Sequence, residues 1–301
     1  MKVKKLIALS VFAITTVYST VNAQGLLDGF TSKKGDLSLT TSFSTSKYDS
    51  FYVANVKKDE VPVHGEINQN IISLYAKYGI TDRLSVVINV PFISSDNTTG
   101  AVDPVNGKNS ISELQDISIA LKLNAHKINF EKANLNIITG FTAVIPTGYE
   151  PNGILSLGSG AFGFDVTAGL HLNTDSGFFS TLFASYNLRG DANNNLTPGK
   201  DFGVPNAFVT TGKIGYASSF IYVEAWADIF NSEEGVDIGS SDFAGNFPET
   251  NVDYKRVGIT VYKNIIPKLG VSLGFGKVID GRNIGEATTF SAGLTYNVSL
   301  K

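Results

Sequence analysis

Strict alternation of apolar and small or polar residues constrains the fold of this chain more than any other feature. In GAFGFDVTAGLHLN, residues 160–173, every second residue from Phe162 to Leu172 is apolar. The residues between them are two glycines, an aspartate, a threonine and a histidine. A period of two indicates a β-strand. Because a half-buried strand of a soluble protein usually has a polar, water-facing side, the fold depends on what each face of this strand contacts.

The same alternation recurs in about twelve segments, each near the ~9–11 residues that a tilted strand needs to cross a bilayer. We predict strands at residues 35–48, 67–79, 84–93, 112–125, 133–146, 161–173, 178–190, 206–216, 220–230, 253–263, 268–278 and 288–300. Short and long connections alternate between them, which is typical of barrels with tight periplasmic turns and longer extracellular loops. The predicted fold class is therefore all-β, a transmembrane outer-membrane β-barrel of about twelve antiparallel strands in up-and-down order.

In such a barrel the row from Phe162 to Leu172 faces lipid, whereas Asp165, Thr167 and His171 face the lumen. Charged residues make up 17% of the chain, below the roughly 25% usual for soluble domains. The alternative, a soluble barrel or sandwich with the apolar rows inward, would need a more charged exterior. A net charge of -3 gives no support for nucleic-acid binding, and the absence of cysteine excludes disulfides and thiolate chemistry.

The N-terminus has the features of an export signal. A basic start, MKVKK, precedes the apolar run LIALSVFAITTV, and Val21, Asn22 and Ala23 match the small-residue pattern of signal-peptidase cleavage. We predict a signal peptide over residues 1–23, a short periplasmic segment over residues 24–34, and an outer-membrane barrel over residues 35–301. Such a protein belongs to a Gram-negative bacterium.

Four segments carry a resemblance to a known family. They are SLYAKYGITDRLSVVINVPF (73–92), TGFTAVIPTG (139–148), residues 160–173 and FSAGLTYNVSL (290–300). The chain resembles the outer-membrane barrel family associated with the meta pathway of phenol degradation. The resemblance implies a transporter for small, often hydrophobic or aromatic compounds, by analogy with long-chain fatty-acid channels. Two features depart from these proteins: residues 24–34 are too few for a plugging N-terminal hatch, and the last residue is Lys301 rather than an aromatic residue.

Twelve strands enclose a lumen between the filled interior of eight strands and the open channel of sixteen, so inward side chains decide whether it conducts. Acids and bases there are nearly balanced, which predicts a weakly selective pore or a salt-bridged plug. The stripe in EAWAD, residues 224–228, would bind a cationic or aromatic solute, or form a brace to Lys213 or Arg256. Our candidates for the solute path are Asp116, Lys122, Asp165, Lys213, Glu224, Trp226, Asp228 and Arg256.

Catalytic and metal motifs are weak. The match to G-x-S-x-G at residues 270–274 lies inside a predicted strand, whereas a nucleophilic serine needs a strand-to-helix turn. The calcium-like D-x-N-x-N at Asp191 has Leu196 where glycine is required. We predict no enzyme activity, no cofactor and no metal.

The favoured function is an outer-membrane channel or transporter for passive passage of small solutes. The alternative is a structural or adhesive barrel acting through its extracellular loops, and an outer-membrane enzyme is less favoured still. The expected partners are outer-membrane lipid, the barrel assembly machinery and a small-molecule solute, with no nucleic acid.

Overall fold

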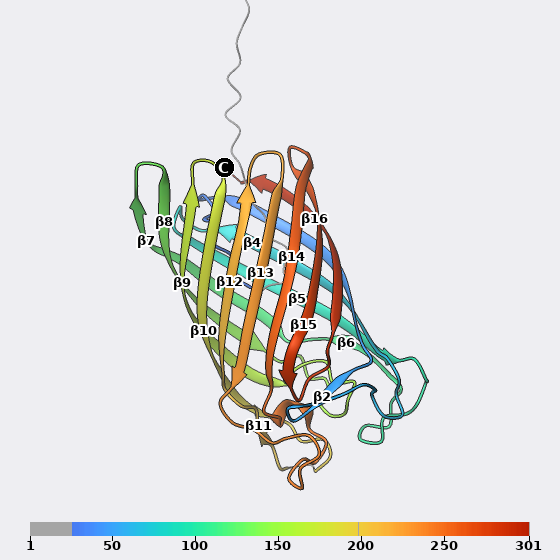
Figure 1. The fold of residues 1–301 in the computed structure, drawn as a ribbon. Coiled ribbons are helices and arrows are strands. Elements are labelled where there is room, and N and C mark those ends of the chain that lie inside the picture. Colours follow the sequence, from blue (N-terminus) through green and yellow to red (C-terminus); the bar gives the residue numbers. More distant parts are fainter. Residues whose placement is uncertain (1–25, 198, 301) are drawn as a thin grey trace, which may run out of the picture.

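A computed structural model describes residues 26–197 and 199–300 and shows one closed barrel (Figure 1). The long strands are β1 (Asp36–Tyr48), β4 (Ile67–Gly79), β5 (Leu84–Asn97), β7 (Ile117–Asn129), β8 (Ala133–Ile145), β9 (Ala161–Thr174), β10 (Phe178–Ala192), β12 (Ala207–Ala217), β13 (Tyr222–Ser232), β14 (Asp253–Ile266), β15 (Leu269–Arg282) and β16 (Thr288–Ser299). Each pairs antiparallel with its neighbours, and β1 pairs with both β4 and β16, so the sheet closes on itself. The predicted twelve-stranded barrel is confirmed.

Short elements lie in the connections between the long strands. They are β2 (Phe51–Val53), β3 (Val56–Lys58), β6 (Ser110–Leu114), β11 (Phe202–Gly203) and the 3-10 helix η1 (Phe247–Glu249). In the part of the chain that the structure describes, no helix has the length and apolar character needed to cross a membrane.

One predicted strand is divided. Residues 112–125 fall partly in β6 and partly in β7, and both pair with β5, through Phe92 opposite Leu114 and Asn89 opposite Ser118. The interruption lies at residues 115–116, where the carboxylate of Asp116 accepts a hydrogen bond from the hydroxyl of Tyr149 at 2.8 Å. A loop contact therefore interrupts a pattern that locally favours one strand.

The two faces of the strands contact different surroundings, as predicted. On β9, Phe162 and Leu170 are 58% and 46% exposed, whereas Thr167 and His171 are buried. The outward apolar side chains of the other strands are exposed in the same way. Because such an apolar belt would be unstable in water, it marks the surface that contacts lipid.

The two ends of the barrel differ in their connections (Figure 1). Residues 80–83, 130–132, 175–177, 218–221 and 267–268 form short turns at one end. The start of β1 lies at this end, since the amide of Gly35 donates to the carbonyl oxygen of Gly79 at 2.8 Å. Loops 98–109, 146–160 and 233–252 lie at the other end. By the convention for outer-membrane barrels, the short turns are periplasmic and the long loops extracellular.

A charge placed in the lipid belt should impair assembly. Leu74 on β4 is 56% exposed and faces lipid, so Leu74→Arg is expected to cost about 2–4 kcal/mol near the midplane of the bilayer. Gln69 on the same strand lines a cavity inside the barrel, so the arginine of Gln69→Arg would not contact lipid and this variant should assemble normally. Heat-modifiable gel migration after refolding into lipid vesicles measures the folded fraction. Equal yields for the two variants would contradict the assignment of faces.

Candidate solute path through the barrel

A cavity of 600 Å³ occupies the extracellular half of the barrel, and we call it the extracellular vestibule. Strands β10, β13 and β14 supply its wall through Arg189, Phe230, Tyr254 and Arg256. Five rings line it: Tyr48, Phe51, Phe230, Phe247 and Tyr254. The vestibule therefore combines aromatic surface with two fixed positive charges.

Extracellular loops cover this vestibule. The carboxylate of Asp103 accepts a hydrogen bond from the amide of Ile154 at 2.7 Å, and the side-chain amide of Asn152 donates to Asn246. Leu155 and Leu157 are buried in an apolar cluster at the same end of the barrel. Because hydrogen bonds and apolar packing both join these loops, they form an ordered cover over the vestibule. We call loops 98–109, 146–160 and 233–252 the roof.

One ion pair of the roof depends on pH. Arg282 donates to Asp237 through Nε at 2.8 Å and through Nη2 at 2.7 Å, and Asn283 donates to it as well. These hydrogen bonds, led by those from Arg282, hold the pKa of Asp237 below its ordinary value of 3.8. A lowered carboxyl pKa means that the stabilisation is present above pH 3.8 and is lost as the pH falls below it.

Protease sensitivity of the roof should follow this titration. We expect cleavage of residues 233–252 to stay slow from neutral pH down to about pH 5, and to become faster only in stronger acid. Asp237→Asn should raise cleavage modestly at neutral pH, because exposed ion pairs contribute little. Limited proteolysis by an acid-tolerant protease measures this, with Asp242→Asn in the same loop as control. Identical cleavage of the two variants would contradict the role of Asp237.

The middle of the lumen contains Trp226, which is 4% exposed. Its indole lies against the backbone of β14 and β15, and a Cβ atom on Gly258 would lie only 2.2 Å from indole Cζ2. A side chain at position 258 would therefore displace the indole. The guanidinium of Arg256 lies 5.2 Å from the centre of the Trp226 ring.

Predicted lumen charges surround this indole. Asp228 accepts a hydrogen bond from Nη2 of Arg256 at 2.7 Å, and the two residues are directly opposite in the register of β13 and β14. The brace to Arg256 that the sequence suggested is present. Glu224 is buried and accepts a hydrogen bond from the hydroxyl of Tyr222, and Lys213 is buried opposite Trp226.

Residues 26–31 enter the periplasmic half of the lumen, and we call them the plug segment. Asp28 is 3% exposed and lies 2.7 Å from Nζ of Lys77 and 2.8 Å from Nζ of Lys122. Lys122 also donates to the carbonyl oxygen of Phe30. One carboxylate therefore joins two buried lysines from β4 and β7.

Apolar contacts hold the plug segment on both sides of Asp28. Leu27 packs against Tyr75 and Val87, and a Cβ atom on Gly140 would lie 2.2 Å from its Cδ1. The ring of Phe30 lies 4.6 Å from His171 and 5.2 Å from Phe179.

The sequence led us to expect a short periplasmic segment over residues 24–34, with too few residues for the N-terminal hatch of fatty-acid channels. In the structure, three side chains and two ion pairs hold residues 26–31 of this segment inside the wall.

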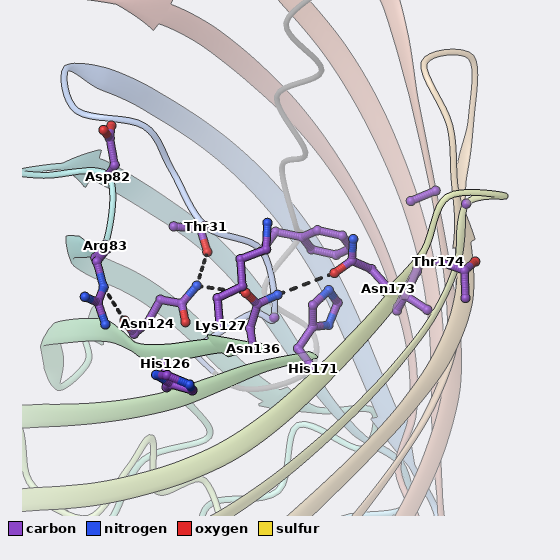
Figure 2. Close-up of a pocket in the computed structure, with 15 residues that line it drawn as sticks. Thr31, Asp82, Arg83, Asn124, His126, Lys127, Asn136, His171, Asn173 and Thr174 are labelled. Carbon is purple, nitrogen blue, oxygen red and sulfur yellow. Dashed lines mark hydrogen bonds between the residues drawn. The ribbon is translucent and has the colours of Figure 1, made fainter. Parts of the chain in front are cut away.

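A second cavity of 580 Å³ lies on the periplasmic side of the plug segment, and we call it the periplasmic vestibule (Figure 2). Its lining is polar. Asn124 donates to Thr31 at 3.1 Å and to Asn136 at 2.9 Å, and Asn136 donates to Asn173 at 3.4 Å. Figure 2 shows this row of amides with Arg83 and His126 at its edge.

The predicted candidates occupy different parts of this path. Lys122 contacts the plug segment, and Trp226, Asp228 and Arg256 form the middle layer. Glu224 and Lys213 lie between the two, since Glu224 binds Tyr222, which packs against Phe30, and Lys213 lies opposite Trp226. Asp165 faces the lumen near Arg189, and Asp116 lies outside this layer at the break between β6 and β7.

Sequence reasoning missed Asp28 and Phe30 as members of the site, whereas the strand periodicity places Lys77 and Arg189 on the inward face without singling them out as solute-path candidates. The only local signal was one acid and one aromatic ring in LLDGF, just before the first strand. The predicted signal peptide and its cleavage after Ala23 lie outside the described residues.

Comparison with solved structures finds other outer-membrane barrels. An outer membrane channel from Pseudomonas putida F1 is 14% identical with a TM-score of 0.68, and the match covers 94% of this chain and 100% of that one. The NanC porin is 8% identical with a TM-score of 0.50, covering 86% of this chain and 98% of that one. These likenesses show the fold of the chain. Comparison with curated protein sequences gives no significant match.

A family model described as "Putative MetA-pathway of phenol degradation" matches residues 71–294, more than half of the 301 residues. The match includes most of the barrel wall and three of the four segments that carried the resemblance in the sequence, and it extends into the fourth. The chain therefore belongs to this family of outer-membrane barrels.

Proposed function

We propose that the chain is a passive outer-membrane channel for small solutes and has no enzymatic role. One observation supports this most directly: a cavity of 600 Å³ and a cavity of 580 Å³ lie in opposite halves of one lumen. Between them lie the plug segment and the layer around Trp226. A solute would therefore meet two vestibules and one short constricted region.

The contacts of the plug segment suit a part that can leave the lumen. Leu27, Asp28 and Phe30 hold it through side chains, and the first barrel strand begins only at Asp36. Displacing it breaks the ion pairs of Asp28, the hydrogen bonds to Phe30 and Thr31, and the apolar contacts of Leu27 and Phe30, while the hydrogen-bonded wall stays intact. In this proposal the wall is permanent and the plug segment controls passage.

The serine of the G-x-S-x-G match supports a non-enzymatic role. Ser272 lies within β15, which continues to Arg282, and its hydroxyl donates to the carbonyl oxygen of Gly293 at 3.4 Å. A nucleophile elbow requires a sharp turn after a strand. The expected partners remain outer-membrane lipid, the barrel assembly machinery and the transported solute.

Reconstitution tests the proposal. Purified protein in proteoliposomes should admit small sugars and amino acids, with rates that fall as solute size rises, and planar bilayers should show brief conductance steps. Empty liposomes and liposomes with heat-denatured protein are the controls. No permeation, even after removal of the plug segment, would refute the channel and favour the structural or adhesive role of the extracellular loops.

A further inference from the structure

The charged side chains that line the extracellular vestibule are arginines. Two arginines, Arg189 and Arg256, line it, and no aspartate or glutamate is among the described residues of its lining. Asp228, in the layer around Trp226, pairs with Arg256, and Asp165 interacts electrostatically with Arg189. The surface that faces the cavity nevertheless presents cationic donors and no carboxylate. Such a surface favours an anionic ligand over a cation.

Arg189 presents donors that its surroundings leave unused. Its Nε and Nη2 are both buried, and no acceptor among the described residues takes a hydrogen bond from either. These two nitrogens form one edge of the guanidinium, and that edge matches the two oxygens of a carboxylate. A buried charged donor without an acceptor is costly, so an anion at this edge would be stabilised.

Arg256 is a weaker candidate for the same role. Its Nη2 already donates to Asp228, although its Nε has no acceptor in the described part of the chain. Arg256 is therefore fixed in place by its partner, whereas Nε and Nη2 of Arg189 have no hydrogen-bond acceptor in the described part of the chain. The geometry favours Arg189 as the main anchor.

Aromatic rings lie between the two arginines. Phe230 and Tyr254 stack with their centres 5.0 Å apart and an interplanar angle of 5°. Arg189 lies over Phe230 at 5.4 Å, and Arg256 over Tyr254 at 5.9 Å. A guanidinium held over a ring keeps its in-plane N–H groups available for a ligand. An aromatic ligand beside Arg189 would meet this stack, with Phe247 of the roof also in the lining.

We propose that the extracellular vestibule is a binding site for small aromatic carboxylates. The carboxylate accepts hydrogen bonds from Nε and Nη2 of Arg189, and the ring packs against Phe230 and Tyr254. The volume of 600 Å³ lies within the ~300–1,000 Å³ typical of ligand pockets. The inference deepens the proposed function by naming a solute class, but binding itself does not require conduction.

The single tryptophan of the chain supplies a local reporter. The ring of Trp226 contacts Arg256, which lines the vestibule, so the fluorescence of Trp226 should respond to a ligand there. We would titrate the detergent-purified full chain with benzoate, with benzyl alcohol as the neutral aromatic analogue, and with cyclohexanecarboxylate as the non-aromatic anion. Benzoate should bind saturably and at least about tenfold more tightly than either analogue, since each lacks one of the two recognised features.

Variants separate the anchor from general effects of charge. Arg189→Met removes the carboxylate-binding edge while keeping the length of the side chain, and should weaken benzoate binding about tenfold or more. Lys255→Met, which removes a surface cation paired with Asp280, should leave it unchanged. If Arg189→Met fails to fold, Phe247→Ala in the roof should still weaken benzoate more than cyclohexanecarboxylate. Equal affinity for benzoate and benzyl alcohol, or full binding by folded Arg189→Met, would overturn the proposal.

Failure of the site and failure of the channel are distinguishable. Saturable benzoate binding without any permeation would keep the site and refute the channel. Permeation of small solutes without preference for benzoate would keep the channel and refute the site.

Discussion

Deleting residues 26–31 is expected to raise the single-channel conductance of the barrel severalfold. In the structure Leu27 and Asp28 are 7% and 3% exposed, and Phe30 packs against rings of the inner wall. Removing these residues empties the part of the lumen next to the periplasmic vestibule, and water can then hydrate Lys77 and Lys122. Planar-bilayer recordings of the wild type and the deletion measure the change, and heat-modifiable gel migration shows that both barrels are folded.

A single substitution provides the matched variant. Asp28→Asn keeps the length of the plug segment but removes the charge that joins two buried lysines. Breaking a buried ion pair by removing one partner typically costs about 3–5 kcal/mol, so the segment should leave the lumen often. We expect frequent openings to the conductance of the deletion. Asp36→Asn, at the half-buried periplasmic start of β1, is the control for loss of one acid. Wild-type conductance in both the deletion and Asp28→Asn would show that the plug segment does not limit passage.

The barrel was predictable from sequence because its determinants are local. Alternation over ten or more residues sets both the strand and its two faces, and closure follows once each hairpin pairs with the next. Strand β9 illustrates this, since Phe162, Val166 and Leu170 face outward where their spacing predicts. The break between β6 and β7 was not predictable, because it coincides with the contact of Asp116 with Tyr149, which is 33 residues away.

The candidate site was predictable only where its partners lie on neighbouring strands. Asp228 and Arg256 lie on consecutive long strands, so the sequence places them side by side. Asp28 lies in a segment without periodicity, and its partners Lys77 and Lys122 are 49 and 94 residues away. No local pattern specifies which buried lysines of a twelve-stranded wall an acid in this short segment will join. The extracellular vestibule was missed for the same reason, since loops distant in sequence roof it.

Replacing Trp226 by alanine should widen the constriction between the plug segment and the extracellular vestibule. The indole is 4% exposed and lies on β13 in the layer between the two vestibules. In an apolar core such a truncation would cost about 3–5 kcal/mol. The cost here should be smaller, because water can enter the lumen and hydrate the Asp228 and Arg256 pair that remains.

Combining Trp226→Ala with deletion of residues 26–31 tests whether the two layers lie in series. Resistances in series add, so removing either layer alone leaves the other to limit the current. The double variant should therefore show a conductance gain larger than the sum of the two single gains. Trp226→Phe, which keeps a ring in the layer, should add much less to the deletion. A double variant that conducts no better than the deletion alone would place Trp226 off the solute path and leave the plug segment as the sole barrier.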